Sequence, residues 1–165
     1  MIDDQLRSEA VAVLNLCRER KLMVATAESC TGGLVAGCLT EIPGSSEVVD
    51  RGFVTYSNEA KQEMLGVTAA VLNQHGAVSR ATAEAMATGA IERSSAHLAV
   101  SITGVAGPGG GTPAKPVGLV HFAAAARDGR HIHREMRYGD IGRSEIRRLS
   151  VLDALDLLRA LAAAQ

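Results

Sequence analysis

The sequence contains very few aromatic residues. Phe, Tyr and Trp together make up 2% of its 165 residues, and Trp is absent. Rings that stack on unpaired bases are therefore scarce, which argues against a protein that binds single-stranded nucleic acid. Hydrophobic residues still make up 47% of the chain, so we expect a core of Leu, Val, Ile and Ala.

An excess of charge of either sign is also missing. The 17 Lys and Arg residues nearly balance the 18 Asp and Glu residues. Such a chain has no overall positive field that would attract a polyanion, so we expect no nucleic-acid partner. An anionic ligand would have to be small and held locally.

The sequence also lacks a disulfide framework and long apolar runs. Its cysteines are odd in number, namely Cys17, Cys30 and Cys38. The N-terminal residues 1–4 are acidic, unlike the basic start of a signal peptide. No apolar stretch reaches the roughly 20 residues that a membrane helix needs. We therefore expect a reduced, cytoplasmic protein without a membrane segment.

The length suits one domain over residues 1–165, and the apolar pattern predicts alternating helices and strands. Helices are expected over 4–20, 31–39, 59–65, 69–74, 79–93 and 144–163. Strands are expected over 22–27, 48–56, 97–103, 118–125 and 130–137. The alternation at the front predicts parallel crossovers, and the turn at 127–130 predicts a late antiparallel hairpin. The result would be one mixed sheet with helices on both faces.

The first candidate site is the segment Glu28–Gly33, between an expected strand and the next helix. Ligands in α/β folds bind at the carboxyl ends of strands. A hydroxyl from Ser29 would lie there beside the free N–H groups of a helix start, which stabilise an oxyanion or a phosphate. The alternative is that Ser29 or Thr31 only caps the helix and that Gly32 and Gly33 permit close packing.

The second candidate site is Tyr56–Lys61, at the end of the next strand. Lys61 falls near the start of a helix, where the dipole is unfavourable for a cation. Together with partial burial, this position would lower the pKa of Lys61 and make it a usable general base for a serine. The alternative is a solvated surface lysine beside a tyrosine that packs on the sheet.

The third candidate site is the Gly- and Pro-rich loop 104–116, directly after Thr103. It lacks the Gly-Lys-Ser/Thr of a phosphate-binding P-loop, and Pro113 and Pro116 oppose the helix of a dinucleotide fold. We interpret it as a pocket wall whose N–H groups, with Thr103 and Lys115, face a ligand. A surface loop without a ligand is the alternative.

Two other chemistries are not favoured by the sequence. Cys30 is the rival nucleophile, but no histidine is identifiable as its base. The five histidines lack the grouping of metal ligands apart from His131 and His133, which would share one face of an exposed edge strand. We therefore expect no metal.

Taken in order, these motifs resemble the C-terminal domain of the CinA family. The matching segments are 27–33 (AESCTGG), 43–46 (PGSS), 56–61 (YSNEAK), 103–108 (TGVAGP), 110–112 (GGT) and 115–118 (KPVG). The resemblance covers nearly the whole chain. It implies an α/β fold, a three-layer α/β/α sandwich with a mixed, mostly parallel sheet, and no cofactor.

The resemblance also implies an activity, because this domain exists alone as nicotinamide-nucleotide amidase. That enzyme hydrolyses the carboxamide of nicotinamide mononucleotide in pyridine-nucleotide salvage. The family's catalytic residues match Ser29, Tyr56 and Lys61. The expected substrate contacts are Thr31, Gly32, Gly33, Asn58, Thr103, Gly104, Gly107, Gly111, Lys115 and Arg143. The N–H groups of residues 31–33 are expected to hold the oxyanion.

The chain departs from the family pattern at one place. The Gly-Asp-Arg stretch before the last helix reads Gly139-Asp140-Ile141-Gly142-Arg143 here, with two extra residues before the arginine. Two other functions stay open: a nucleotide-binding regulatory module without chemistry, and a hydrolase of another small amide. Ala- and Leu-rich helix faces further suggest a homodimer.

Overall fold

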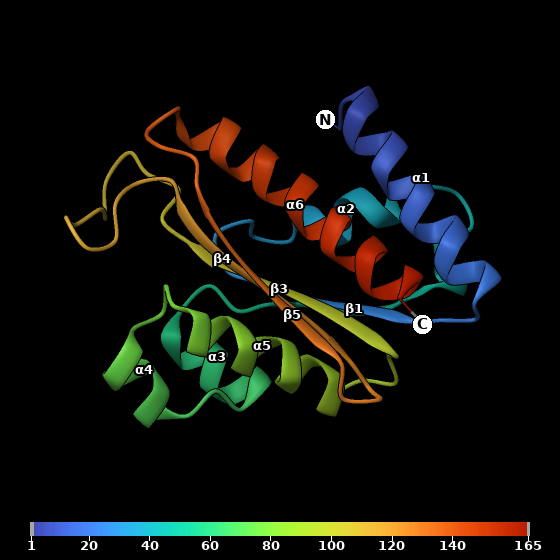
Figure 1. Ribbon diagram of the computed structural model, residues 1–165, viewed down its shortest axis with the longest axis horizontal. Helices are drawn as coiled ribbons and strands as arrows, with labels where there is room; N and C mark the ends of the chain where they lie inside the picture. The colour runs from blue at the N-terminus through green and yellow to red at the C-terminus, as the bar shows by residue number, and fades with distance from the viewer. Residues whose placement is uncertain (1, 165) are drawn as a thin grey trace.

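Five strands form one sheet between two layers of helices in the computed structural model, which describes residues 2–164 (Figure 1). The strands are β1 (Val24–Glu28), β2 (Val49–Val54), β3 (Leu98–Gly104), β4 (Leu119–Ala126) and β5 (His131–Arg137). The helices are α1 (Asp4–Glu19), α2 (Leu34–Thr40), α3 (Asn58–Leu65), α4 (Ala69–His75), α5 (Arg80–Glu92) and α6 (Arg143–Ala163), with a short 3-10 helix at Ser45–Glu47.

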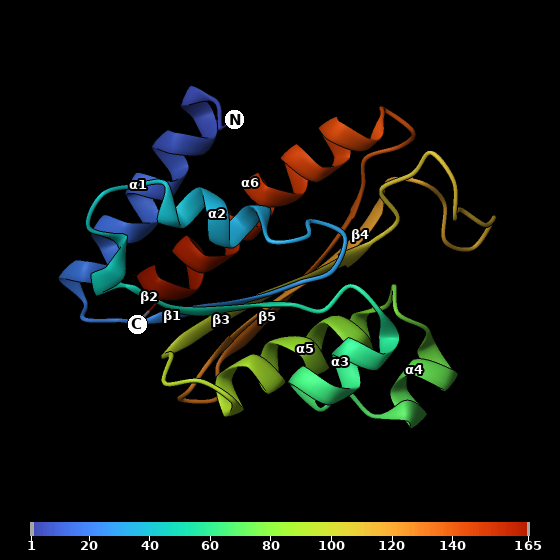
Figure 2. The same ribbon diagram turned by 180° about the vertical axis from the view of Figure 1, so that it is seen from behind.

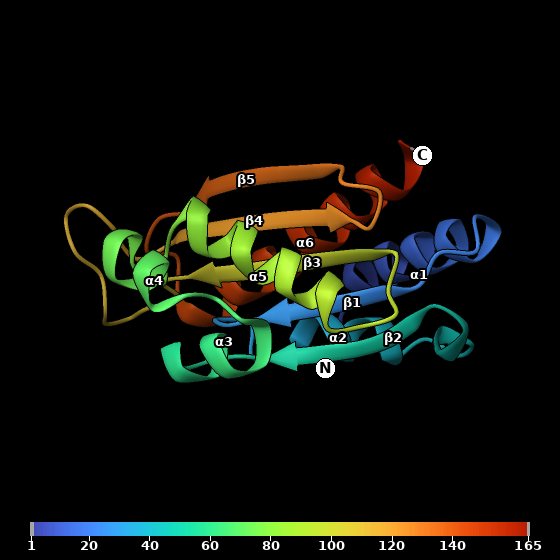
Figure 3. The same ribbon diagram turned by 90° about the horizontal axis from the view of Figure 1, so that it is seen from below.

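The sheet is mixed, with the strand order β2-β1-β3-β4-β5 (Figure 3). Strands β1, β2 and β3 run parallel, β4 is antiparallel to β3, and β5 is antiparallel to β4. Four of the five strands therefore point the same way. Helices α1, α2 and α6 cover one face and α3, α4 and α5 cover the other (Figure 2). The expected three-layer α/β/α sandwich with a mixed sheet is confirmed.

The two faces of the sheet differ in side-chain size because strand residues alternate between them. Large residues of β3 and β4, such as Val100, Ile102 and Phe122, pack towards α1 and α6. Small residues, such as Ala99 and Ala123, face α5. Small side chains let α5 lie close to the sheet, and Gly89 of α5 lies against the backbone of α3. Helices α3 and α5 therefore pack closely against each other.

The second helix begins later than expected. The sequence predicts a helix from residue 31, whereas α2 begins at Leu34. Gly32 and Gly33 have φ angles of 59° and 102°, which an α-helix does not accommodate. Residues 29–33 are therefore a turn between β1 and α2. Within residues 2–164, no helix has the length and apolar character needed to cross a membrane.

Candidate active site

The site lies where three neighbouring parallel strands end. Ser29 follows β1, Tyr56 follows β2, and Thr103 lies near the end of β3. The strand ends are joined by two backbone hydrogen bonds: the N–H of Thr55 donates to the Glu28 carbonyl at 2.8 Å, and the N–H of Ser29 donates to the Ile102 carbonyl at 2.9 Å. The parallel register thus brings segments far apart in sequence to one edge of the sheet.

Lys61 joins the first two of these segments. Its Nζ lies 3.0 Å from Ser29 Oγ, 3.0 Å from the Thr55 carbonyl oxygen and 3.2 Å from the Tyr56 carbonyl oxygen. Helix α3, capped by the Ser57 hydroxyl on the N–H of Ala60, carries Lys61 in its first turn. The two carbonyl groups orient the amine towards Ser29.

The surroundings of Lys61 lower its pKa. The side chain is 1% exposed, so it is not the solvated lysine that was the alternative interpretation. Burial disfavours the charged form and lowers the pKa from its ordinary value of 10.5, while nearby Cys30 acts weakly in the other direction. No carboxylate among the described residues forms an ion pair with Lys61. Burial, which was expected from the sequence together with the helix dipole, is the main cause of the lowered pKa.

The turn after Ser29 is held by the carboxylate of Glu28. This residue is fully buried and accepts hydrogen bonds from Thr31 Oγ1 at 2.6 Å and from the N–H groups of Val35 and Ala36 at 2.9 and 3.1 Å. A carboxylate of the protein itself therefore occupies the start of α2. The N–H groups of Val35 and Ala36, in the first turn of α2, are therefore engaged and are not free for an oxyanion or phosphate.

Cys30 does not have the surroundings of a reactive thiol. Its side chain is buried, and burial raises its pKa to about 12. A thiol with this pKa is almost entirely protonated near neutral pH, and the thiolate is the nucleophilic form. The structure therefore favours Ser29 over its neighbour as the nucleophile.

A pocket of about 220 Å³ opens beside Ser29 and Lys61. Seven of the residues expected from the sequence line it: Ser29, Tyr56, Asn58, Lys61, Thr103, Gly104 and Arg143. The remaining lining residues are Cys30, Ala77, Val78 and Ala106. Ala77 and Val78, from the connection between α4 and α5, carried no chemical signal in the sequence.

Arg143 reaches the pocket despite the two extra residues before it. It begins α6, and its guanidinium donates to the Gly107 carbonyl at 2.8 Å and to Tyr56 Oη at 3.1 Å. Tyr56 is 60% exposed. Tyr56 therefore binds Lys61 through its backbone carbonyl, and its hydroxyl is directed to Arg143.

Six of the expected substrate contacts do not line this pocket. Thr31 is buried with its hydroxyl bonded to Glu28, and the N–H of Gly32 donates to the Ser29 carbonyl. Gly33 lies at the start of α2. Gly107 contributes a carbonyl to Arg143, and Gly111 is exposed. Lys115 donates its amine to the His75 carbonyl at 2.6 Å. Much of the loop 104–116 extends away from the sheet (Figure 1).

His131 and His133 lie two positions apart on one face of the edge strand β5, as expected from the sequence. His133 of β5 faces His121 of β4, with Nδ1 of His121 3.0 Å from Nε2 of His133. Burial lowers the pKa of both imidazoles. Within residues 2–164 no group of three His, Cys, Asp or Glu side chains is arranged to hold a metal ion.

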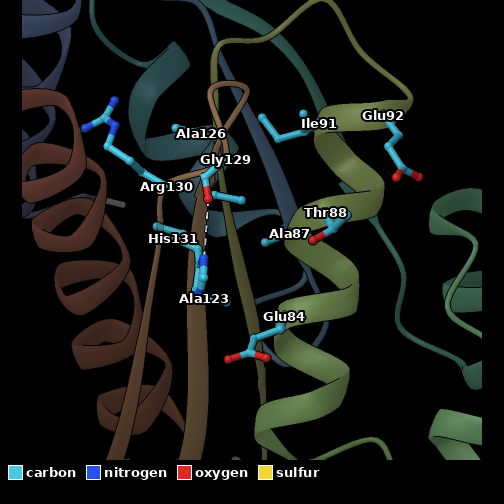
Figure 4. A pocket seen from close by; sticks show the side chains of 12 residues that line it. Glu84, Ala87, Thr88, Ile91, Glu92, Ala123, Ala126, Gly129, Arg130 and His131 are labelled. Carbon is cyan, nitrogen blue, oxygen red and sulfur yellow. Dashed lines mark hydrogen bonds between the residues drawn. The ribbon is translucent and has the colours of Figure 1, made fainter. Parts of the chain in front are cut away.

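A second hollow, of about 320 Å³, lies between α5 and the β4–β5 hairpin (Figure 4). Glu84 and Glu92 project from α5 on one side, and Arg130 and His131 lie on the other (Figure 4). Its described lining residues include no serine, cysteine or lysine. The smaller pocket at the strand ends is therefore the better candidate for nucleophilic chemistry.

Known proteins resemble this chain over nearly all of its length. The family model for the CinA C-terminal domain matches residues 6–162. A putative competence-damage inducible protein from Caldicellulosiruptor bescii is 49% identical over 158 residues, which cover 96% of this chain and 38% of that protein. A CinA-like protein from Synechococcus sp. is 53% identical over 95% of this chain and 37% of its own length. The chain thus spans under two fifths of these curated relatives.

Solved structures match over nearly the full length of both chains. The competence/damage inducible protein CihA from Agrobacterium tumefaciens is 58% identical, with a TM-score of 0.96 and 98% of each chain covered. The competence damage-inducible protein A from Klebsiella pneumoniae is 33% identical, with a TM-score of 0.91 and coverage of 96% of this chain and 97% of that one.

Proposed function

Because the chain belongs to the CinA C-terminal domain family, we propose that it is a cytoplasmic amidohydrolase that converts nicotinamide mononucleotide to nicotinate mononucleotide and ammonia. The observation that carries this proposal is the 3.0 Å contact between Lys61 Nζ and Ser29 Oγ, with the lysine almost fully buried. A serine becomes an effective nucleophile when a neighbouring base takes its proton, and a buried lysine with a lowered pKa is such a base. Amide hydrolysis is chemistry that this pair supports.

The reaction begins with neutral Lys61. Its amine takes the proton of the Ser29 hydroxyl while Oγ forms a bond to the carboxamide carbon. The C–N bond then breaks, and the proton held by Lys61 leaves with the amine as ammonia. A water molecule attacks the resulting ester, again giving its proton to Lys61. Release of the carboxylate product returns the proton to Ser29, so that one amide and one water yield one acid and one ammonia.

The oxyanion of each tetrahedral intermediate needs hydrogen-bond donors beside Ser29. We assign this role to the N–H of Cys30, which directly follows the nucleophile in a strand-to-helix turn. Of residues 30–33, Cys30 is the one that lines the pocket. The N–H groups of Thr31–Gly33 were expected from the sequence to hold the oxyanion, but these residues do not line the pocket.

The nucleotide part of the substrate would be held at the mouth of the pocket. Arg143 supplies the guanidinium there, and its contact with Tyr56 Oη orients both side chains. An arginine suits a phosphate because its planar fork offers two parallel N–H donors. Asn58, exposed at the start of α3, adds an amide that can contact the ribose.

The proposal is tested by ammonia release from nicotinamide mononucleotide with wild type, Ser29→Ala and, as a matched control, Ser95→Ala. Ser95 is exposed, in the connection between α5 and β3. We expect release by wild type and the control and none by Ser29→Ala. Binding of the nucleotide without release would favour a regulatory binding module, and release only from other amides would change the substrate.

A further inference from the structure

An arginine outside the pocket contacts the backbone that follows the nucleophile. Arg147, one turn into α6, donates from Nε to the Cys30 carbonyl at 3.1 Å and from Nη2 to the Thr31 carbonyl at 3.3 Å. These contacts span more than 110 positions in sequence. A planar guanidinium that binds two successive carbonyl groups fixes the peptide planes between them.

The rest of the turn is held by other groups. The Glu28 carboxylate binds the Thr31 hydroxyl and the first N–H groups of α2, as described above. The N–H of Gly32 donates to the Ser29 carbonyl at 3.0 Å, and the N–H of Leu34 donates to the Thr31 carbonyl at 3.0 Å. The Glu28 carboxylate therefore accepts hydrogen bonds from the turn and from the start of α2, and the Arg147 guanidinium donates hydrogen bonds to two carbonyl groups of the turn.

These contacts secure Ser29 on both sides along the chain. On its N-terminal side, the Ser29 N–H is bonded to Ile102 of β3. On its C-terminal side, the next two carbonyl groups are those that Arg147 binds. Catalysis by a nucleophile is sensitive to displacements of about 1 Å, even when the cause lies away from the reacting atoms.

We propose that Arg147 is a positioning residue: through the carbonyl groups of Cys30 and Thr31, it holds Ser29 and the N–H of Cys30 in register with Lys61. Its kinetic consequence rests on the proposed function. Its structural consequence, the order of the turn, does not.

The adjacent Arg148 provides a matched control on the same helix. Its guanidinium donates to Asp3 at 2.5 Å and to Gln5 at 2.7 Å, near the start of α1, and contacts neither Cys30 nor Thr31. Both arginines line a hollow of about 410 Å³ between α1, α2 and α6. Truncation of Arg147 therefore leaves a space that an added guanidinium ion can enter from solvent.

The first measurement is amide hydrogen exchange in Arg147→Ala and Arg148→Ala. We expect faster exchange at Gly32 and Leu34 in Arg147→Ala, because their N–H groups form the hydrogen bonds of the turn, and wild-type exchange there in Arg148→Ala. The proposal would be overturned if Gly32 and Leu34 exchanged at the same rate in Arg147→Ala as in Arg148→Ala. This outcome does not depend on the substrate of the protein.

The second measurement is the reactivity of Ser29 towards a fluorophosphonate, followed by mass spectrometry. Ser29 Oγ forms a bond to phosphorus, fluoride leaves, and the hydroxyl proton passes to Lys61. We expect labelling, and kcat for ammonia release, to fall roughly 10- to 100-fold in Arg147→Ala with little change in KM. Guanidinium far below denaturing concentrations should restore part of the rate, and Arg148→Ala should match wild type.

The outcomes separate this proposal from the proposed function. A wild type that is labelled but inert towards nicotinamide mononucleotide would remove only the substrate assignment, and labelling would still test Arg147. Wild-type labelling in Arg147→Ala, or a loss that guanidinium does not restore, would overturn the positioning role. A wild type that is neither labelled nor active would overturn the proposed function and the kinetic role of Arg147, and hydrogen exchange at Gly32 and Leu34 would then decide whether Arg147 orders the turn.

Discussion

Lys61 Nζ lies 3.0 Å from Ser29 Oγ, although 32 positions separate the two residues in the chain. The pairing follows from parallel register: β1 and β2 end side by side, and α3, which follows β2, packs against β2 and carries Lys61 back to Ser29. The amine is held there by the carbonyl groups of Thr55 and Tyr56.

The pH dependence of activity should follow the protonation of Lys61. Only the neutral amine accepts a proton, so kcat/KM should rise with pH through the lysine pKa, which burial places below 10.5. The free energy of unfolding should also rise with pH in this range. The unfolded chain keeps the proton of Lys61 up to a pH near 10.5, whereas the folded chain loses it at the lowered pKa, so the folded state gains stability between these two pH values. A pH–rate profile measures the first effect, and an ascending limb at or above 10.5 would contradict it.

Replacement of Cys30 by alanine should leave the reaction intact. The thiol is protonated near neutral pH because burial raises its pKa to about 12, and Ser29 remains in place. We expect kcat close to wild type and a loss of stability of about 1 kcal/mol from the small cavity. Ammonia release and urea unfolding test these expectations. Loss of activity together with a normal fold would move the nucleophile to Cys30.

Replacement of Arg143 by methionine should weaken recognition of the phosphate. A hydrogen bond to a charged group contributes about 1.5–3 kcal/mol, so KM for nicotinamide mononucleotide should rise about tenfold or more. Nicotinamide riboside lacks the phosphate, and its KM should change little. Arg51→Met is the control, because Arg51 lies on the edge strand β2 and pairs with Asp50. Equal losses for the two substrates would remove Arg143 from phosphate binding.

Replacement of Glu28 by glutamine should loosen the turn that follows Ser29. The amide nitrogen cannot accept the hydrogen bonds from Val35, Ala36 or Thr31 that a carboxylate oxygen accepts. A buried donor left without its acceptor costs about 1–3 kcal/mol, which urea unfolding would detect. The exposed Glu63→Gln serves as the control. A variant as stable as wild type would show that Glu28 does not hold the turn.

The sequence predicted the elements well because their ends carry strong local signals. Ser57 caps α3, Ser79 caps α5, and Gly66 ends α3 in a left-handed conformation. The start of α2 was predicted wrongly, because the positive φ angles of Gly32 and Gly33 are set by the tertiary fold. A glycine in sequence permits such an angle but does not require it.

The candidate site was predicted less completely than the elements. Ser29, Lys61 and Arg143 converge on one pocket. The burial of Lys61, and the hydrogen bond that Arg143 donates to Tyr56 Oη, depend on packing between distant segments. The sequence did not reveal the role of Glu28. A carboxylate that caps a helix is recognised by its distance from the first helical residue, and the start of α2 was predicted at the wrong residue. Lys115 binds the His75 carbonyl rather than lining the pocket. The homodimer stays a prediction.

The most direct test of the central claim is ammonia release from nicotinamide mononucleotide by wild type and Lys61→Met, with the exposed Lys21→Met as the control. Methionine fills a similar volume without a base, and a general base contributes about 10²- to 10⁴-fold to a rate. We predict a loss of that size in kcat for Lys61→Met, with a folded protein and a fully active control. Near wild-type turnover by Lys61→Met would contradict the Ser29–Lys61 mechanism.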